Sequence, residues 1–286
     1  MPTWDFDTPG HVQLDLEIPF GRVELESGTS DSTHVSLEGN DSVTRELVED
    51  GRVEMRRRGD GYEVVVEVKH RGFMFSIGRA PEIRLRVNCP TGSDATVRTK
   101  SADVEARGAY GVFELKTASG DVSVEEIQRD GRFKSASGDV SVDQVGGQLQ
   151  VQTASGDVAV QRVRGDAIAQ LVSGDLWIRD AGASVHANTV SGDQRIDAIV
   201  DGTLEAHAVS GDVHVGVRRG SRVYVDANTI SGSTSSELDL SDAPAGDSAG
   251  DDDDDENAPL VEVRAKTVSG DISIVRAAAP APLPAE

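Results

Sequence analysis

Aspartates recur through this chain at a regular interval, and their spacing is the first feature that could support chemistry. Eight of them occupy the third place of a repeated Ser-Gly-Asp or Ser-Ala-Asp tripeptide: Asp103, Asp121, Asp139, Asp157, Asp175, Asp193, Asp212 and Asp271. If the copies stack about 4.8 Å apart, neighbouring carboxylates repel by about 0.9 kcal/mol per pair even in bulk water. Some local interaction must offset that repulsion.

Two interpretations of these aspartates are open. In the first, each carboxylate accepts a backbone N–H in its own turn, and solvent screens the remaining charge. In the second, calcium lies between successive coils on a ladder of Asp121, Asp139, Asp157, Asp175, Asp193 and Asp212. The chain lacks the tandem G-G-x-G-x-D nonapeptides of the calcium-loaded β-roll. We therefore predict no metal site and no cofactor, with the calcium ladder as the alternative.

A column of predicted surface residues changes character along the chain. Two residues after the aspartate, where a strand should face solvent, it reads Ser123, Ser141, Ala159, Trp177, Arg195 and His214. The three bulky residues fall in successive repeats, so we expect them to be neighbours. An exposed Trp beside an Arg is typical of recognition patches, whereas a tolerated surface Trp is the simpler alternative. We predict Trp177, Arg195 and His214 as partner-binding residues.

No pattern in the sequence predicts catalysis. Hydroxyl residues recur two places before the repeat serine, at Thr99, Thr117, Ser135, Thr153, Thr189, Thr229 and Thr267. No histidine recurs beside them, so we interpret them as structural, with stacked hydroxyls hydrogen-bonding along the axis. The H-E-x-x-H, G-x-S-x-G, phosphate-loop and dinucleotide motifs are all missing. We predict no catalytic residues and no enzymatic activity.

The repeat that positions these columns has a fixed period. The repeat serines stand at 101, 119, 137, 155, 173 and 191, each 18 residues from the last, and the later steps are 19, 21 and 38. A constant period indicates stacked units. Apolar residues alternate after each aspartate and again before each serine, which predicts two half-buried strands per repeat. We therefore predict an all-β fold, a single-stranded β-solenoid with coils of about 18 residues.

Composition divides the chain into segments. Residues 1–90 are β-rich without the 18-residue period, and we predict an N-terminal cap or irregular opening coils, while the periodicity near 41–50 is too poor to decide for or against a short helix. Residues 91–276 are predicted to form the solenoid repeats. We interpret the 38-residue step between Ser231 and Ser269 as a loop of some twenty residues inserted between two strands. This acidic segment, about 237–259, and the alanine- and proline-rich tail, 277–286, are predicted to be disordered.

The repeats resemble a known protein family. The Thr-Ala-Ser-Gly-Asp-Val-x-Val units, preceded by Ile-Arg-Leu-Arg-Val-Asn-Cys-Pro-Thr-Gly at 83–92, are similar to a bacterial and archaeal family of β-strand-repeat putative adhesins, a domain of unknown function. The resemblance covers roughly residues 10–276. It implies a β-solenoid without a known catalytic centre and supplies no site residues.

Three functions are consistent with these features. We favour a non-enzymatic scaffold or adhesin-like protein with a protein or glycan partner. The first alternative is a self-assembling cytoskeletal solenoid similar to the bactofilins, with end-to-end association. The second is a polysaccharide-acting β-helix enzyme.

Charge and cysteine content limit the partners and the compartment. The formal charge of −22 argues against nucleic acids and anionic lipid surfaces as partners. The single cysteine, Cys89, excludes an internal disulfide, and we expect it to be a packed residue and not a reactive thiol. Acidic residues interrupt the first twenty positions, and no 18-residue apolar run exists, so we expect a cytoplasmic protein without a membrane span. Arg56–Arg58 is interpreted as a solvated strand edge or, alternatively, an anion site.

Overall fold

The computed structural model describes residues 2–69, 82–238 and 259–277. The chain divides into two compact units, Met1–Val160 and Gln161–Glu286, and each is described by itself. The predicted acidic insertion and tail fall largely on residues 239–258 and 278–286, which lie outside the described residues.

In its described residues the N-terminal unit contains one helix, α1 (Ser42–Glu49), and twelve strands that lie wholly within it: β1 (Thr3–Asp7), β2 (Val12–Gly28), β3 (Ser32–Gly39), β4 (Arg52–Arg58), β5 (Gly61–Glu67), β6 (Ile83–Pro90), β7 (Asp94–Tyr110), β8 (Phe113–Thr117), β9 (Val122–Ile127), β10 (Gly131–Ser137), β11 (Val140–Val145) and β12 (Leu149–Ser155). Strand β13 (Val158–Val163) spans the boundary between the units.

Parallel coils make up the later part of the N-terminal unit. Strands β8, β10 and β12 pair side by side with equivalent residues 18 apart, so Leu115, Phe133 and Val151 form one buried row. Strands β9 and β11 form the other wall in the same register, with Val124 opposite Val142. Each coil therefore contributes two strands, and their inward aliphatic and aromatic residues fill the space between the walls.

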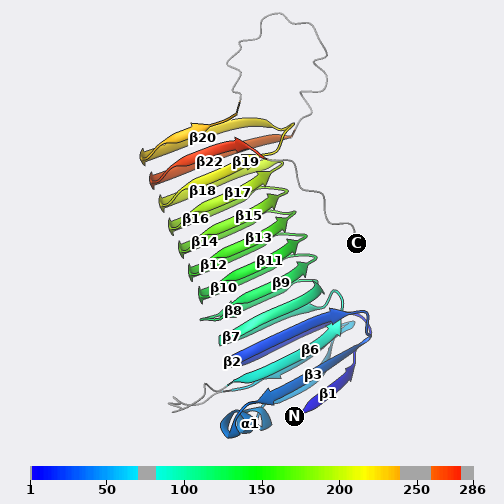
Figure 1. The fold of residues 1–286 in the computed structure, drawn as a ribbon. Helices are drawn as coiled ribbons and strands as arrows, with labels where there is room; N and C mark the ends of the chain where they lie inside the picture. Colours follow the sequence, from blue (N-terminus) through cyan, green and yellow to red (C-terminus); the bar gives the residue numbers. More distant parts are fainter. Residues whose placement is uncertain (1, 70–81, 239–258, 278–286) are drawn as a thin grey trace, which may run out of the picture. The chain divides into compact units, whose positions relative to one another are not determined.

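The first strands close the beginning of this unit. The long strand β2 pairs in parallel with β7 along one side and with β5 and β6 along the other. Antiparallel pairs then follow, β3 with β6, β1 with β3 and β4 with β5 (Figure 1). Helix α1 begins at a capping box, because the Asp41 carboxylate accepts from the Thr44 N–H and the Thr44 hydroxyl accepts from the Asp41 N–H. The sequence left a helix near 41–50 undecided, and the structure shows one there.

The described part of the C-terminal unit contains ten strands that lie wholly within it: β14 (Ala167–Ser173), β15 (Leu176–Ala181), β16 (Val185–Ser191), β17 (Gln194–Ile199), β18 (Gly202–Ser210), β19 (Val213–Val217), β20 (Arg222–Ser231), β21 (Thr234–Ser236), β22 (Leu260–Ser269) and β23 (Ile272–Arg276). All the strand pairs described within it are parallel. The equivalent residues are 18 or 19 apart between consecutive coils, as where Val185 lies opposite Ala167 and Leu204 lies opposite Val185.

The spatial order of the last coils differs from their order in the chain. Strand β22 pairs with β18 on one side and with β20 on the other, so the final coil lies between two coils that precede it (Figure 1). The second wall agrees, because β23 pairs with both β19 and β21. The repeat spacing did not predict this order, and the loop predicted between the two strands falls largely outside the described residues. Residues 222–236 form the end coil of the stack. The coil of residues 260–276 lies between that end coil and the coil that carries β18 and β19.

The packing confirms the predicted β-solenoid in each unit. Inward residues such as Val124, Val142 and Leu204 are almost completely buried, and burial of each such side chain contributes roughly 1.5–3 kcal/mol. Cys89 is also buried, as predicted.

Arg56, Arg57 and Arg58 are exposed, which confirms the prediction of a solvated strand edge. Arg56–Arg58 lies on β4, whose described strand partner is β5. Arg56 pairs with Glu54, Arg58 pairs with Glu63, and the Arg57 guanidinium lies over the Tyr62 ring.

Candidate partner-binding surface

Trp177, Arg195 and His214 lie beside one another on the C-terminal unit. Strands β15, β17 and β19 place them in register, with Trp177 opposite Arg195 and Arg195 opposite His214. Arg195 is exposed, and Trp177 and His214 are partly exposed. The sequence therefore predicted both the adjacency and the outward orientation of this column. Its binding role stays a prediction.

One carboxylate orders two members of this column. Asp197 Oδ2 accepts from the Trp177 indole Nε1 at 2.8 Å, and Asp197 Oδ1 accepts from Arg195 Nε at 2.6 Å. The indole edge is thus occupied, which leaves the ring face and the exposed part of the guanidinium for a partner. Sequence reasoning did not include Asp197, although its place two residues beyond Arg195 on the same strand face could have indicated it.

The third member is held in its neutral form. Partial burial, followed by the positive charge of Arg195, lowers the pKa of His214 below its usual value.

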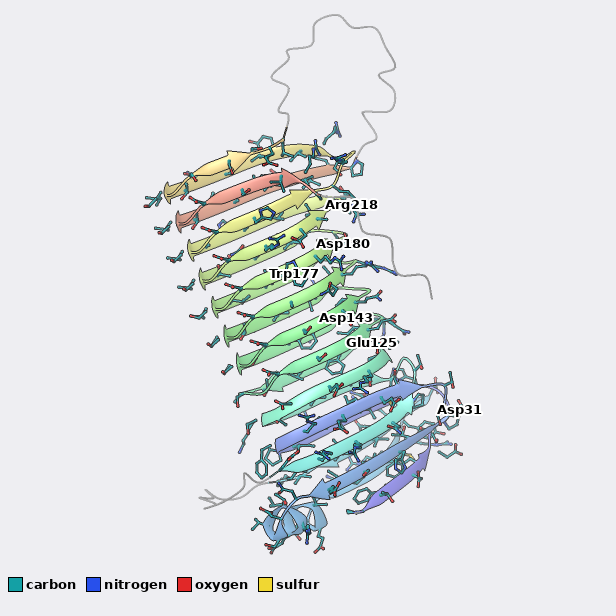
Figure 2. All side chains as sticks on the ribbon, viewed as in Figure 1. Asp31, Glu125, Asp143, Trp177, Asp180 and Arg218 are labelled. Carbon is teal, nitrogen blue, oxygen red and sulfur yellow. The ribbon has the colours of Figure 1, made fainter. Side chains whose placement is uncertain are left out.

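An ion pair joins two residues near this column. Arg218 Nη2 donates to Asp180 Oδ1 at 2.7 Å, and both residues are labelled with Trp177 in Figure 2.

The corner aspartates are satisfied in a way that the sequence did not predict. Seven of the eight carboxylates, those of Asp103, Asp121, Asp139, Asp175, Asp193, Asp212 and Asp271, accept the backbone N–H of the equivalent residue in the adjacent coil. The Asp121 N–H binds Asp103 Oδ1 at 3.2 Å, and the Asp212 N–H binds Asp193 Oδ1 at 2.8 Å. The expectation of a bond within the same turn is therefore wrong, because stacking brings the next coil's N–H closer to the carboxylate.

The hydrogen bonds of the corner aspartates follow the same coil order as the strand pairing. The Asp271 N–H binds Asp212 Oδ1, and the Ser233 N–H binds Asp271 Oδ1. The two bonds that Ser233 donates through its N–H and hydroxyl lower the pKa of Asp271. Within the described residues, no group of three or more His, Cys, Asp or Glu side chains is arranged to hold a metal ion. The calcium alternative stays a prediction.

The hydroxyl column stabilises the corners through carbonyl groups. Thr117, Ser135 and Thr153 each donate to the carbonyl of the corner serine two residues later, at 2.7–3.2 Å. In the C-terminal unit, Thr229 and Thr267 donate to corner carbonyls of adjacent coils. The bonds of Thr229 and Thr267 run between coils, along the axis as expected, whereas those of Thr117, Ser135 and Thr153 stay within their own corner.

The C-terminal unit also exposes an aliphatic column that sequence reasoning missed. It occupies the position before the corner serine, and the serines pair coil by coil along β14, β16, β18, β22 and β20. The exposed fractions are 53% for Val172, 49% for Val190, 50% for Val209, 46% for Val268 and 80% for Ile230. The same position holds Ala118, Ala136 and Ala154 in the N-terminal unit. That change from alanine to β-branched residues was the available signal.

Three comparisons with known proteins bear on identity. No curated protein compared matches the chain. Similar solved structures include a putative adhesin from Bacteroides fragilis (13% identity, TM-score 0.46, 96% of each chain covered) and a putative adhesin from Parabacteroides distasonis (11%, 0.36, 95% of this chain and 96% of that one). Another is a putative cell adhesion protein from Clostridium sporogenes (10%, 0.29, 96% and 99%).

A family model gives the assignment. Across the described residues, no helix has the length and apolar character that crossing a membrane requires. The family model described as Toastrack DUF4097 matches residues 13–275, which confirms the resemblance seen in the repeats. The chain therefore belongs to the Toastrack DUF4097 family.

Proposed function

We propose that this protein is a non-enzymatic, adhesin-like β-solenoid scaffold that binds another macromolecule through its C-terminal unit. The observation that carries the proposal is the aliphatic column of Val172, Val190, Val209, Val268 and Ile230. Single exposed apolar residues are ordinary on protein surfaces. A contiguous apolar row across five paired strands is different, because rows of this kind mark interaction sites on soluble proteins.

The chemistry around the column suits a partner surface. The five strands that carry it contain three acidic side chains, Glu205, Asp226 and Glu262, and three basic ones, Arg222, Arg264 and Lys266. The charges on these five strands therefore cancel in a chain whose formal charge is −22, although the exposed corner aspartates Asp175, Asp193, Asp212 and Asp271 follow the column three residues later. The column itself thus offers an apolar contact without a charged side chain to desolvate.

The proposal is tested by changing the polarity of the column while keeping its shape. Val190→Thr with Val209→Thr retains β-branching and strand propensity but adds two hydroxyls. The control, Ala136→Thr, adds a hydroxyl at the same outward position of the N-terminal unit. Proteins and glycans retained from a lysate of the native host would be quantified on all three immobilised chains. We expect the double variant to lose bound proteins or glycans that the unchanged chain and Ala136→Thr both retain. If all three chains retain the same molecules, the proposal is contradicted.

Trp177, Arg195 and His214 give the same unit a second proposed contact surface. Because these side chains project from the opposite wall, Trp177→Ala should remove a different set of retained molecules from the one that Val190→Thr and Val209→Thr remove. If Trp177→Ala changes nothing in that assay, this column has no binding role.

Self-assembly is a second candidate because coil 222–236, at the end of the stack, is paired on one side only among the described residues. Among the described residues, β20 pairs only with β22, and its inward residues Val223 and Val225 are half-buried whereas Val263 of β22 is fully buried. Unpaired strand edges template association. Sedimentation velocity would detect end-to-end oligomers, and Val223→Lys should abolish them. A monomer at every concentration would exclude this candidate.

A further inference from the structure

The N-terminal unit carries a concentration of basic residues that the solenoid fold does not require. The chain contains five lysines, and three of them, Lys100, Lys116 and Lys134, fall in neighbouring coils of this unit. Strand register places Lys116 directly between Arg98 and Lys134, because Arg98 lies opposite Lys116 and Lys116 lies opposite Lys134. All three side chains are exposed. We call Arg98, Lys116 and Lys134 the basic column.

The basic column borders a shallow hollow in the surface. The hollow is lined by Arg98, Lys116, Lys134 and Arg132, together with Thr96, Val97, Glu114 and Leu115. Arg132 comes from the adjacent outward column, where it lies opposite Glu114. Four cationic groups thus converge on one depression of β7, β8 and β10.

Ion pairs within the unit neutralise only part of this charge. Arg98 Nη1 binds Asp15 Oδ1 at 2.6 Å, and Arg132 Nη1 binds Glu114 Oε1 at 2.6 Å. Among the described residues, no salt bridge reaches the ammonium groups of Lys100, Lys116 or Lys134. Two cations of the hollow, Lys116 and Lys134, therefore have no ion-pair partner among the described residues, on a chain whose formal charge of −22 reflects many carboxylates.

The spacing of the column indicates the form of its ligand. Adjacent strands place successive rungs about 4.8 Å apart, so the column presents positive charge at that interval along the stack. Uronic acid polysaccharides carry one carboxylate per sugar ring, and their repeat along an extended chain is close to this spacing. Flexible lysine ammonium groups accommodate the remaining mismatch, because they act as mobile point charges.

Nucleic acid fits this surface less well. Single-stranded nucleic acid is bound through aromatic platforms and a long basic groove, and no aromatic side chain lines this hollow. The rest of this acidic chain would also repel a dense phosphate backbone.

We infer that the basic column of the N-terminal unit is a binding site for linear carboxylated polysaccharide lying across β7, β8 and β10. Only a few exposed charges participate, so the affinity is modest and decreases as salt screens the contacts. The site is separate from the apolar column of the C-terminal unit, and its success or failure is independent of the proposed function.

Binding to oligogalacturonate tests the inference, with a neutral galacto-oligosaccharide of matched length as the reference ligand. Isothermal titration would compare the full chain with Lys116→Gln plus Lys134→Gln. The charge-matched control is Arg222→Gln plus Lys266→Gln, which removes two positive charges from exposed strand positions of the other unit. Thermal melts would establish that all three chains are folded.

The full chain and the control should bind oligogalacturonate, and the affinity should decrease when salt rises from about 20 to 150 mM. Loss of the two lysines should weaken binding by roughly tenfold. No binding at low salt would overturn the inference, and so would equal weakening in the control. Equal or tighter binding of a DNA oligonucleotide or of anionic vesicles would also overturn it, because the surface would then recognise polyanions in general.

Discussion

Stacked Ser-Gly-Asp corners leave no room for a side chain at the central glycine, and Gly192→Ala tests this directly. Gly192 has φ +136, and a Cβ built there would lie 2.1 Å from the carbonyl oxygen of Gly174 in the adjacent coil. That oxygen belongs to the backbone, so the coils themselves would have to separate. Gly220 is a matched control, because it also has a positive φ (+88) but nothing lies within 4 Å of its added Cβ.

The magnitudes of the two effects differ. Gly220→Ala carries only the conformational cost of positive φ, about 1–2 kcal/mol. Gly192→Ala adds forced overpacking of the backbone, about 1–3 kcal/mol more. At roughly 2–4 °C per kcal/mol, Gly192→Ala should have the lower melting temperature by several degrees.

Thermal and urea unfolding of the two variants would measure this difference, with circular dichroism as the probe. Repeat arrays can unfold non-cooperatively, so the two methods must agree before free energies are compared. Equal destabilisation by both substitutions would show that the corners are not in contact, and the reasoning about every column would fail.

Three further predictions concern single side chains. Burial raises the pKa of Cys89 to about 11, so a thiol reagent at pH 8 should label it only on unfolding, and fast labelling of the native protein would contradict its packing. The pKa of His214 is lowered in the folded protein, so its contribution to stability is present above about pH 6.5 and is lost as the pH falls through the folded-state pKa. The melting temperature should therefore be lower at pH 5.5 than at pH 7.5. His214→Gln should make this difference smaller. Trp177→Ala should lower the free energy of unfolding by only about 1 kcal/mol, since the partly exposed ring lies on the outer face of its strand and loses its bond to Asp197; a loss several times larger by denaturant titration would mean that the ring is a core residue.

The sequence allowed the columns to be predicted because the period of 18 determines which residues are equivalent. Trp177, Arg195 and His214 are adjacent for that reason alone. Hydrogen-bond partners could not be predicted in the same way. The period does not specify whether a corner carboxylate binds its own turn or the next coil, and Asp193 binds the next coil.

The order of the last coils was beyond sequence reasoning for a different reason. Coils 222–236 and 260–276 present the same strand pattern, so either could stack on β18 with comparable apolar contact.

Gln194 is an exception to the pattern of aliphatic inward residues. It occupies an inward position that is otherwise aliphatic in the neighbouring coils, and its amide donates to Thr189 Oγ1 and the His207 carbonyl. These partners of Gln194 lie on β16 and β18, so the residue pattern along β17 alone could not identify them.

Disulfide trapping in the C-terminal unit tests the stacking order most directly. His207 and Lys266 are neighbours on β18 and β22, about 4.8 Å apart, whereas His207 and Asn228 are separated by the intervening β22 and lie about 9.6 Å apart. A disulfide requires Cα atoms within about 7 Å. Oxidation should therefore cross-link His207→Cys with Lys266→Cys in high yield and leave His207→Cys with Asn228→Cys reduced. The reverse result would place β20 directly on β18 and contradict the coil order on which the account of the C-terminal unit depends.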